Sequence, residues 1–179
     1  STRYETLFPY TRSSDLSGYE HSWNVFDRSD LGGRMTMLDD MREVLGAALK
    51  SLGYSVNDPD PAHLEEARLV VERWKPNLVK FDAESFAKSF ASGEFWVVQG
   101  YAENVFIEYP EDRRDEVDFF FPKEGVPMYM DSFCVLEGAK NADAAYRFVD
   151  YMLRPDVAAR VADYLMLPSP NVPARALMK

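Results

Sequence analysis

Two pairs of side chains in this sequence could hold a positively charged ligand. Tyr129 and Asp131 form the first pair and lie in the β-prone segment Met128–Ser132. Because residues two apart on a strand point to the same face, the ring and the carboxylate are expected side by side. A protonated amine suits such a pair, since the ring face attracts the cation and the carboxylate neutralises it.

Asp40 and Glu43 form the second pair, at the start of a predicted helix. Residues three apart share one helix face, so both carboxylates could reach the same cation. The same spacing also fits a capping box, in which Asp40 caps the helix and contributes about 1 kcal/mol. Both interpretations stay open, and Asp40 could serve both through different oxygens.

Strand-like and helix-like patterns alternate along the chain, which predicts an α/β layered fold. Residues 1–21 show no periodicity, and residues 111–116 form a charge run typical of a solvated loop. Strands are expected at 34–38, 95–99, 117–121 and 128–136. Helices are expected at 40–52, from about 61 to just before Pro76, and at 83–92, 103–109, 142–153 and 155–165.

Length and charge limit the class of protein. A chain of 179 residues fits one large domain or one lobe of a bilobed protein. The net charge of -10 argues against nucleic acid or an anionic membrane as a partner. No run reaches the ~20 apolar residues of a membrane span, so a protein embedded in the membrane is not expected.

Several conspicuous residues have structural interpretations. Cys134 lies in the apolar run 133–136 and is expected to be a buried, inert thiol. The tryptophans at 23, 74 and 96 are expected to pack in the core. His21 and His63 are isolated in polar surroundings, so no metal site is predicted.

Five blocks of sequence, taken together, point to a family: 38–44 (LDDMREV), 49–54, 121–125 (FPKEG), 129–132 (YMDS), and 139–158 with the ending 168–171. Over roughly residues 22–179 the chain resembles the second lobe of polyamine-binding proteins, the spermidine/putrescine receptors of ABC-type uptake systems. The block after residue 139 is shared by many solute-binding proteins. The acidic helix start and the Tyr129/Asp131 pair carry the polyamine-specific likeness.

The resemblance implies a three-layer lobe of the type II periplasmic-binding-protein fold, with a mixed sheet flanked by helices. It implies a linker or hinge over residues 1–21 and the second ligand-binding lobe over 22–130. Residues 131–179 would form a return strand, a helix pair and a loop of the first lobe. The first part of that lobe has no counterpart here, so the chain is expected to be a fragment of a bilobed protein.

The resemblance also assigns roles to individual residues. Asp131 matches the family's principal amine-binding aspartate, although an ion pair with an arginine is the alternative. Tyr101 and Tyr129 match aromatic walls where relatives often have tryptophan, and ordinary packing is their alternative. The full set of expected ligand contacts is Asp40, Glu43, Tyr101, Asn104, Tyr129 and Asp131.

The implied function is that of a receptor without enzymatic activity, cofactor or metal. It would act in the periplasm or elsewhere outside the cytoplasm, with or without a lipid anchor, and pass polyamines to the membrane permease of an ABC importer. The alternative is a receptor of the same fold for ferric ion or an anion. The sequence has no Tyr-Tyr pair for iron, and acids at a helix start oppose an anion. A glycosidase needs two carboxylates about 5–10 Å apart across the scissile bond, which suits two acids of one helix turn poorly.

Overall fold

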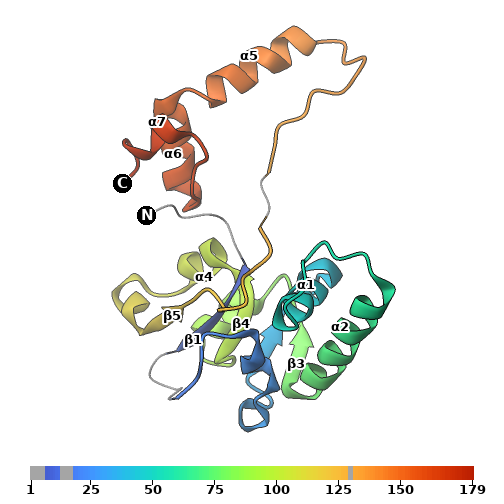
Figure 1. The fold of residues 1–179 in the computed structure, drawn as a ribbon. Coiled ribbons are helices and arrows are strands. Elements are labelled where there is room, and N and C mark those ends of the chain that lie inside the picture. The colour runs from blue at the N-terminus through green and yellow to red at the C-terminus, as the bar shows by residue number, and fades with distance from the viewer. Residues whose placement is uncertain (1–6, 13–17, 129–130) are drawn as a thin grey trace. The chain divides into compact units, whose positions relative to one another are not determined.

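The computed structural model describes residues 7–12, 18–128 and 131–179. These residues divide into two compact units, one ending at Met128 and the other comprising 131–179. The first unit contains the sheet, and the elements of the second are helices (Figure 1). The assignment of the second unit to a different lobe stays a prediction.

A mixed sheet forms the centre of the first unit (Figure 1). Within the described residues its strands follow the order β3 (Leu78–Phe81), β2 (Met35–Met37), β4 (Val97–Tyr101), β1 (Leu7–Arg12) and β5 (Val117–Phe119). β2 pairs in parallel with β3 and β4, whereas β1 pairs antiparallel with β4 and β5. The predicted mixed sheet is confirmed.

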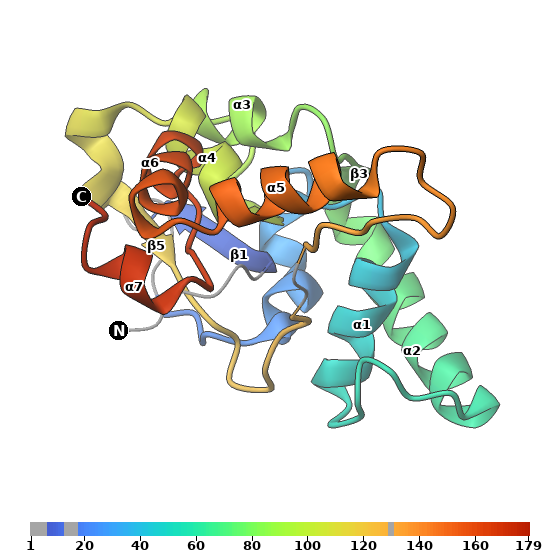
Figure 2. The same ribbon diagram turned by 90° about the horizontal axis from the view of Figure 1, so that it is seen from above.

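Helices cover both faces of this sheet. α1 (Met41–Ser51) and α2 (Pro61–Trp74) pack in one hydrophobic core, and α3 (Phe86–Ala91) and α4 (Ala102–Glu108) pack in another. Val97 belongs to the first core and its neighbour Val98 to the second. Because successive strand residues point to opposite faces, the two cores lie on opposite sides of the sheet. Figure 2 shows this three-layer arrangement, which the sequence predicted.

Local signals place the ends of α2 where the sequence predicts them. Asp60 caps α2 by accepting a hydrogen bond from the Ala62 amide at 2.8 Å, and α2 ends before Pro76. Trp23 and Trp74 are fully buried, which confirms their structural role. Trp96 is half-buried, with the Arg34 guanidinium 5.2 Å from its ring centroid.

Residues 7–12, which show no periodicity in the sequence, form the sheet strand β1 between β4 and β5, and the linker or hinge assignment for residues 1–21 stays a prediction. Two other predictions for the first unit need correction. Residues 111–116 form a 3-10 helix rather than an irregular loop, and α3 is shorter than predicted. Further 3-10 helices lie at Trp23–Asp27, Ser29–Leu31 and Lys75–Asn77.

The second unit contains α5 (Ala142–Met152), α6 (Pro155–Leu165) and α7 (Val172–Arg175). The first two match the predicted helix pair. The strand predicted up to Leu136 is wrong over 131–136, which have no regular structure. A strand requires a hydrogen-bonded neighbour, and none of the described strands pairs with this segment. For the same reason Cys134 is exposed rather than buried.

Candidate ligand-binding site

Two predicted site segments lie at the same edge of the sheet. β2 and β4 are parallel neighbours, with Met35 opposite Val97, so their carboxyl ends meet at one edge. β2 leads through Leu38–Asp40 into α1, and β4 leads through Tyr101 into α4 (Figure 1). In open α/β sheets, ligands bind outside the carboxyl ends of parallel strands. The fold therefore brings Asp40, Glu43, Tyr101 and Asn104 to an edge suited to binding.

Asp40 caps α1, which confirms one of the two interpretations that its position allowed. Its Oδ1 accepts hydrogen bonds from the backbone amides of Arg42 at 2.9 Å and Glu43 at 3.1 Å. The side chain is exposed, and no described residue donates a hydrogen bond to Oδ2. One oxygen therefore holds the helix, and the other can accept from a ligand.

Glu43 is buried next to this cap. Its side chain is only 8% exposed, and its Oε2 atom has no hydrogen-bond partner among the described residues. The reciprocal half of a capping box, a hydrogen bond from the Asp40 amide to Glu43, is absent between these two residues. Burial raises the pKa of Glu43 to about 7, the negative charge of Asp40 adds to the rise, and Arg42 opposes it.

Gln99 connects β4 to the backbone at the start of α1 through two hydrogen bonds. This fully buried side chain donates from Nε2 to the Glu43 backbone oxygen at 3.3 Å. Its Oε1 accepts from the Leu38 amide at 3.4 Å. The end of β4 thereby holds the backbone on both sides of Asp40, which fixes the position of the two acids. In the sequence, a polar residue inside an apolar strand is the signal that points to this role.

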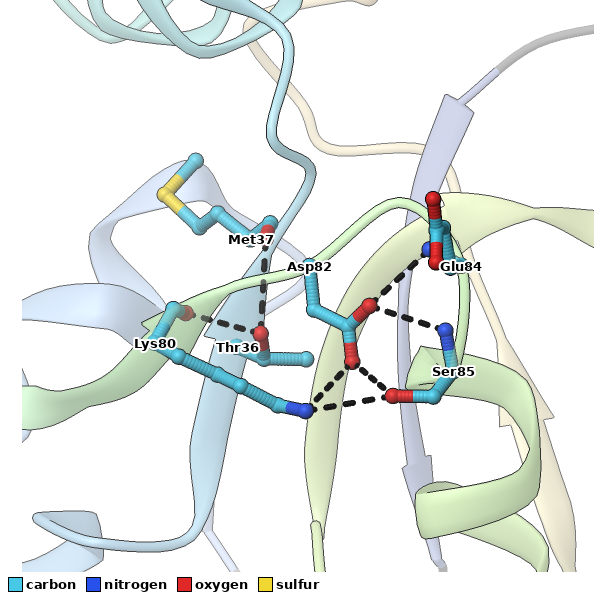
Figure 3. A network of polar contacts seen from close by, with 6 residues as sticks. All are labelled: Thr36, Met37, Lys80, Asp82, Glu84 and Ser85. Carbon is cyan, nitrogen blue, oxygen red and sulfur yellow. Dashed lines mark hydrogen bonds and ion pairs between the residues drawn. The ribbon is translucent and has the colours of Figure 1, made fainter.

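Asp82 follows β3 at the same edge and shows how a buried carboxylate is normally satisfied (Figure 3). Its Oδ1 accepts from the amides of Glu84 at 2.9 Å and Ser85 at 2.8 Å, and its Oδ2 accepts from the Ser85 hydroxyl and from Lys80 Nζ at 2.8 Å. Burial alone would raise the pKa of Asp82, but these hydrogen bonds and the Lys80 charge hold it well below its usual range. Asp82 therefore fixes the turn before α3.

The start of α4 supplies the remaining residues of this edge. Tyr101 and Asn104 are half-buried. Glu103, which the sequence analysis did not single out, is also half-buried, and burial raises its pKa. An acid two residues beyond a buried strand was the signal that could have identified it.

The remaining two predicted contacts are Tyr129 and Asp131. Tyr129 falls outside the described residues. Asp131 belongs to the second unit, where it is exposed and forms no ion pair with a described residue. The alternative role of Asp131 as the partner of an arginine therefore finds no support within the described part of the chain.

A groove of about 360 Å³ lies on the flank of α1 that faces α2. Of the predicted contacts in the first unit, its lining contains Asp40 but not Glu43, Tyr101 or Asn104. The residues that line it are Leu38, Asp39, Asp40, Met41, Val44, Leu45, Arg68, Val71, Glu72, Lys75 and Phe81.

A three-layer lobe with charged and aromatic residues at the carboxyl edge of its sheet defines a class of ligand-binding α/β proteins rather than one ligand. Residues 11–177 match the family of bacterial extracellular solute-binding proteins, and the chain belongs to that family. The family is one of binding proteins and not a class of enzymes.

Individual relatives confirm the resemblance to polyamine-binding proteins. The chain is 34% identical over 190 residues to a putrescine/cadaverine-binding protein of Pseudomonas aeruginosa, covering 96% of this chain and 54% of that protein. It is 33% identical over 157 residues to the spermidine/putrescine-binding periplasmic protein of Escherichia coli, covering 88% and 44%. The crystal structure of the TpPotD lipoprotein of Treponema pallidum matches with a TM-score of 0.93 and 44% identity, covering 99% and 57%.

The chain thus spans about half the length of these relatives. The match to a solved binding protein confirms the predicted periplasmic-binding-protein-like fold. Among the described residues, no helix combines the length and apolar character that crossing a membrane requires.

Proposed function

We propose that this chain supplies part of the polyamine-binding site of an extracytoplasmic receptor. The observation that carries the proposal is the acidic start of α1, which lies at the same sheet edge as Tyr101 and Asn104. An acidic helix start favours a cation over an anion. The names of the relatives, which bind putrescine, cadaverine or spermidine, point to the same ligand class.

Binding in this proposal is reversible capture without chemistry. Each terminal ammonium group of a polyamine donates up to three hydrogen bonds and needs oxygen acceptors. Asp40 and Glu43 would neutralise one end, with Tyr101 against the methylene chain and Asn104 as a polar contact. Asp131 and Tyr129 would hold the other end. Closure of two lobes would then exclude water and strengthen each charge interaction.

We also propose a place and a partner for this receptor. It would work in the periplasm or on the outer side of the cytoplasmic membrane and release its ligand to the permease of an ABC importer. A lipid anchor is one way to keep it there, and one relative is a lipoprotein by name. The function requires no cofactor, metal or nucleic acid.

Calorimetric titration of the intact protein tests this proposal. Putrescine and spermidine should bind, whereas ferric ion and sulfate, which represent the alternative ligands, should not. The Asp131→Asn variant should lose about 2–5 kcal/mol of polyamine binding, because closure would bury an ammonium group without its counter-charge. Asp150→Asn, which changes another exposed acid of the second unit, should bind normally. Unchanged polyamine affinity in folded Asp131→Asn would remove that residue from the site.

A further inference from the structure

Glu43 differs in one respect from the other well-buried carboxylate at this sheet edge. Asp82 is equally inaccessible, 8% exposed, yet accepts hydrogen bonds from two amides, a hydroxyl and an ammonium group. Glu43 is also 8% exposed, but its Oε2 has no partner among the described residues. An unpaired carboxylate buried in this way is strongly disfavoured relative to its protonated form.

The nearby donors are engaged elsewhere. Asp40 Oδ1 accepts from the amides of Arg42 and Glu43 at the start of α1. The Gln99 amide donates to the Glu43 backbone oxygen rather than to its carboxylate. The Arg42 guanidinium donates to Asn57 Oδ1 at 2.7 Å. The site therefore holds a carboxyl group whose charge the surrounding protein compensates only in part, through Arg42, and whose Oε2 has no partner among the described residues.

The charged groups on neighbouring elements add little compensation. On α1 itself, Asp40 raises the pKa of Glu43 and Arg42 lowers it. On α2, Arg68 pairs with Glu65 and Glu72, and at the end of β3 Lys80 pairs with Asp82. The start of α4 contributes Glu103, another acid.

We propose that Glu43 holds a proton in a large share of the empty protein near neutral pH and releases it to solvent when a cationic ligand arrives, so that capture is coupled to proton release. This inference rests on the proposed polyamine function. An ammonium group within about 4–6 Å favours the charged carboxylate, whether or not the two groups touch. Because ligand and proton oppose each other at one carboxyl group, ligand affinity must rise as the pH rises.

The size of the effect follows from the pKa of Glu43, which lies at about 7. The charged, binding-competent form makes up about half of the empty protein at pH 7, and the apparent dissociation constant scales with the inverse of that fraction. The dissociation constant for putrescine should therefore be about tenfold larger at pH 6 than at pH 8. Near pH 7 about half a proton should leave for each ligand bound.

Calorimetry of the intact protein with putrescine, in buffers of low and high ionisation enthalpy, measures this proton directly. The wild-type protein should release about half a proton near pH 7. Glu43→Gln should bind more weakly, release no proton and show a flat affinity between pH 6 and 8. Glu103→Gln tests whether the released proton comes from Glu103 instead, because Glu103 is also a half-buried acid with a raised pKa. It should retain proton release.

A carbon-13 NMR titration of the Glu43 carboxyl group keeps the inference testable if Glu43→Gln fails to bind or fold. That carbon should titrate near neutral pH in the empty protein and well below it with putrescine bound. Binding without proton release, or release that disappears in Glu103→Gln but persists in Glu43→Gln, overturns the inference and leaves the polyamine function intact. Absence of putrescine and spermidine binding at every pH would instead overturn the proposed function.

Discussion

Replacing Glu43 with glutamine should stabilise the folded protein, and the gain should grow with pH. The folded pKa of about 7 lies above the ordinary value of 4.5. Between these two values the folded protein binds more protons than the unfolded chain, so the wild-type protein loses stability as the pH rises from 4.5 through 7. Glutamine is nearly the same size and carries no charge at any pH, so the variant escapes this loss.

The expected size follows from the same two values. The difference between 4.5 and about 7 corresponds to about 3 kcal/mol at 1.36 kcal/mol per pKa unit. This is an upper limit, because water entry or a small rotation would relieve part of the cost. The stabilisation should grow from about 1 kcal/mol at pH 5 to at most about 3 kcal/mol at pH 8. At pH 8 that limit corresponds to a rise in melting temperature of roughly 6–12 °C.

Urea and thermal unfolding at pH 5, 6, 7 and 8 test this prediction. Tryptophan fluorescence reports on the correct unit, since Trp23, Trp74 and Trp96 all belong to the first unit. Asp82→Asn is the matched control with the opposite sign, because hydrogen bonds lower the pKa of that buried acid. It should destabilise the protein at neutral pH. If the gain from Glu43→Gln is absent or does not grow with pH, Glu43 is not the incompletely compensated acid described above.

Two further predictions concern the same edge of the sheet. Asp40→Ala should destabilise the protein by about 1 kcal/mol through loss of the α1 cap. Asp40→Asn should keep the cap and lose only putrescine affinity. Equal melting temperatures for the two variants would show that the cap does not contribute to stability. Gly100→Ala should cost about 1–3 kcal/mol, because an added Cβ would lie 2.0 Å from Phe86 Cε2. A melting temperature within about 1 °C of the wild-type value, which corresponds to less than about 0.5 kcal/mol, would contradict the close approach of the Phe86 ring to Gly100.

The helices were predictable from the sequence because their signals are local. α6 of the second unit has the predicted bounds Pro155–Leu165, with proline at its first position. Asp40, Asp60 and the prolines that follow helices mark ends in the same way. These signals act within a few residues and do not depend on what the helix later packs against.

The strands were less predictable because a strand depends on partners far away in the sequence. β1 contains Pro9, which has no amide hydrogen for the ladder, yet it lies between β4 and β5 with Pro9 opposite Gln99. Conversely, residues 131–136 have a strand-like sequence and no partner strand among those described. In both cases the missing information is the neighbouring strand and not the propensity of the segment itself.

For the candidate site, too, local features were predictable from the sequence and long-range contacts were not. Residue types and spacing predicted Asp40 and Glu43 as an acidic pair, and the helix-cap interpretation of Asp40 is confirmed. Residue types and spacing could not show that Gln99 holds the backbone around Asp40, or that Glu103 becomes half-buried. The roles of Glu43, Tyr101, Asn104 and Asp131 in binding stay predictions until a ligand is titrated.

The stability and the affinity effects of Glu43 share one physical origin. A buried carboxylate that lacks internal donors costs stability when it is charged, and an external ammonium group can supply the missing partner. Binding would then recover part of the free energy that the empty site loses at high pH. A purely structural acid behaves differently. Replacing Asp82 should lower stability and leave the charges of Asp40 and Glu43 unchanged. For Glu43, greater stability with weaker binding in the glutamine variant is the combination that separates a ligand-binding acid from a structural one.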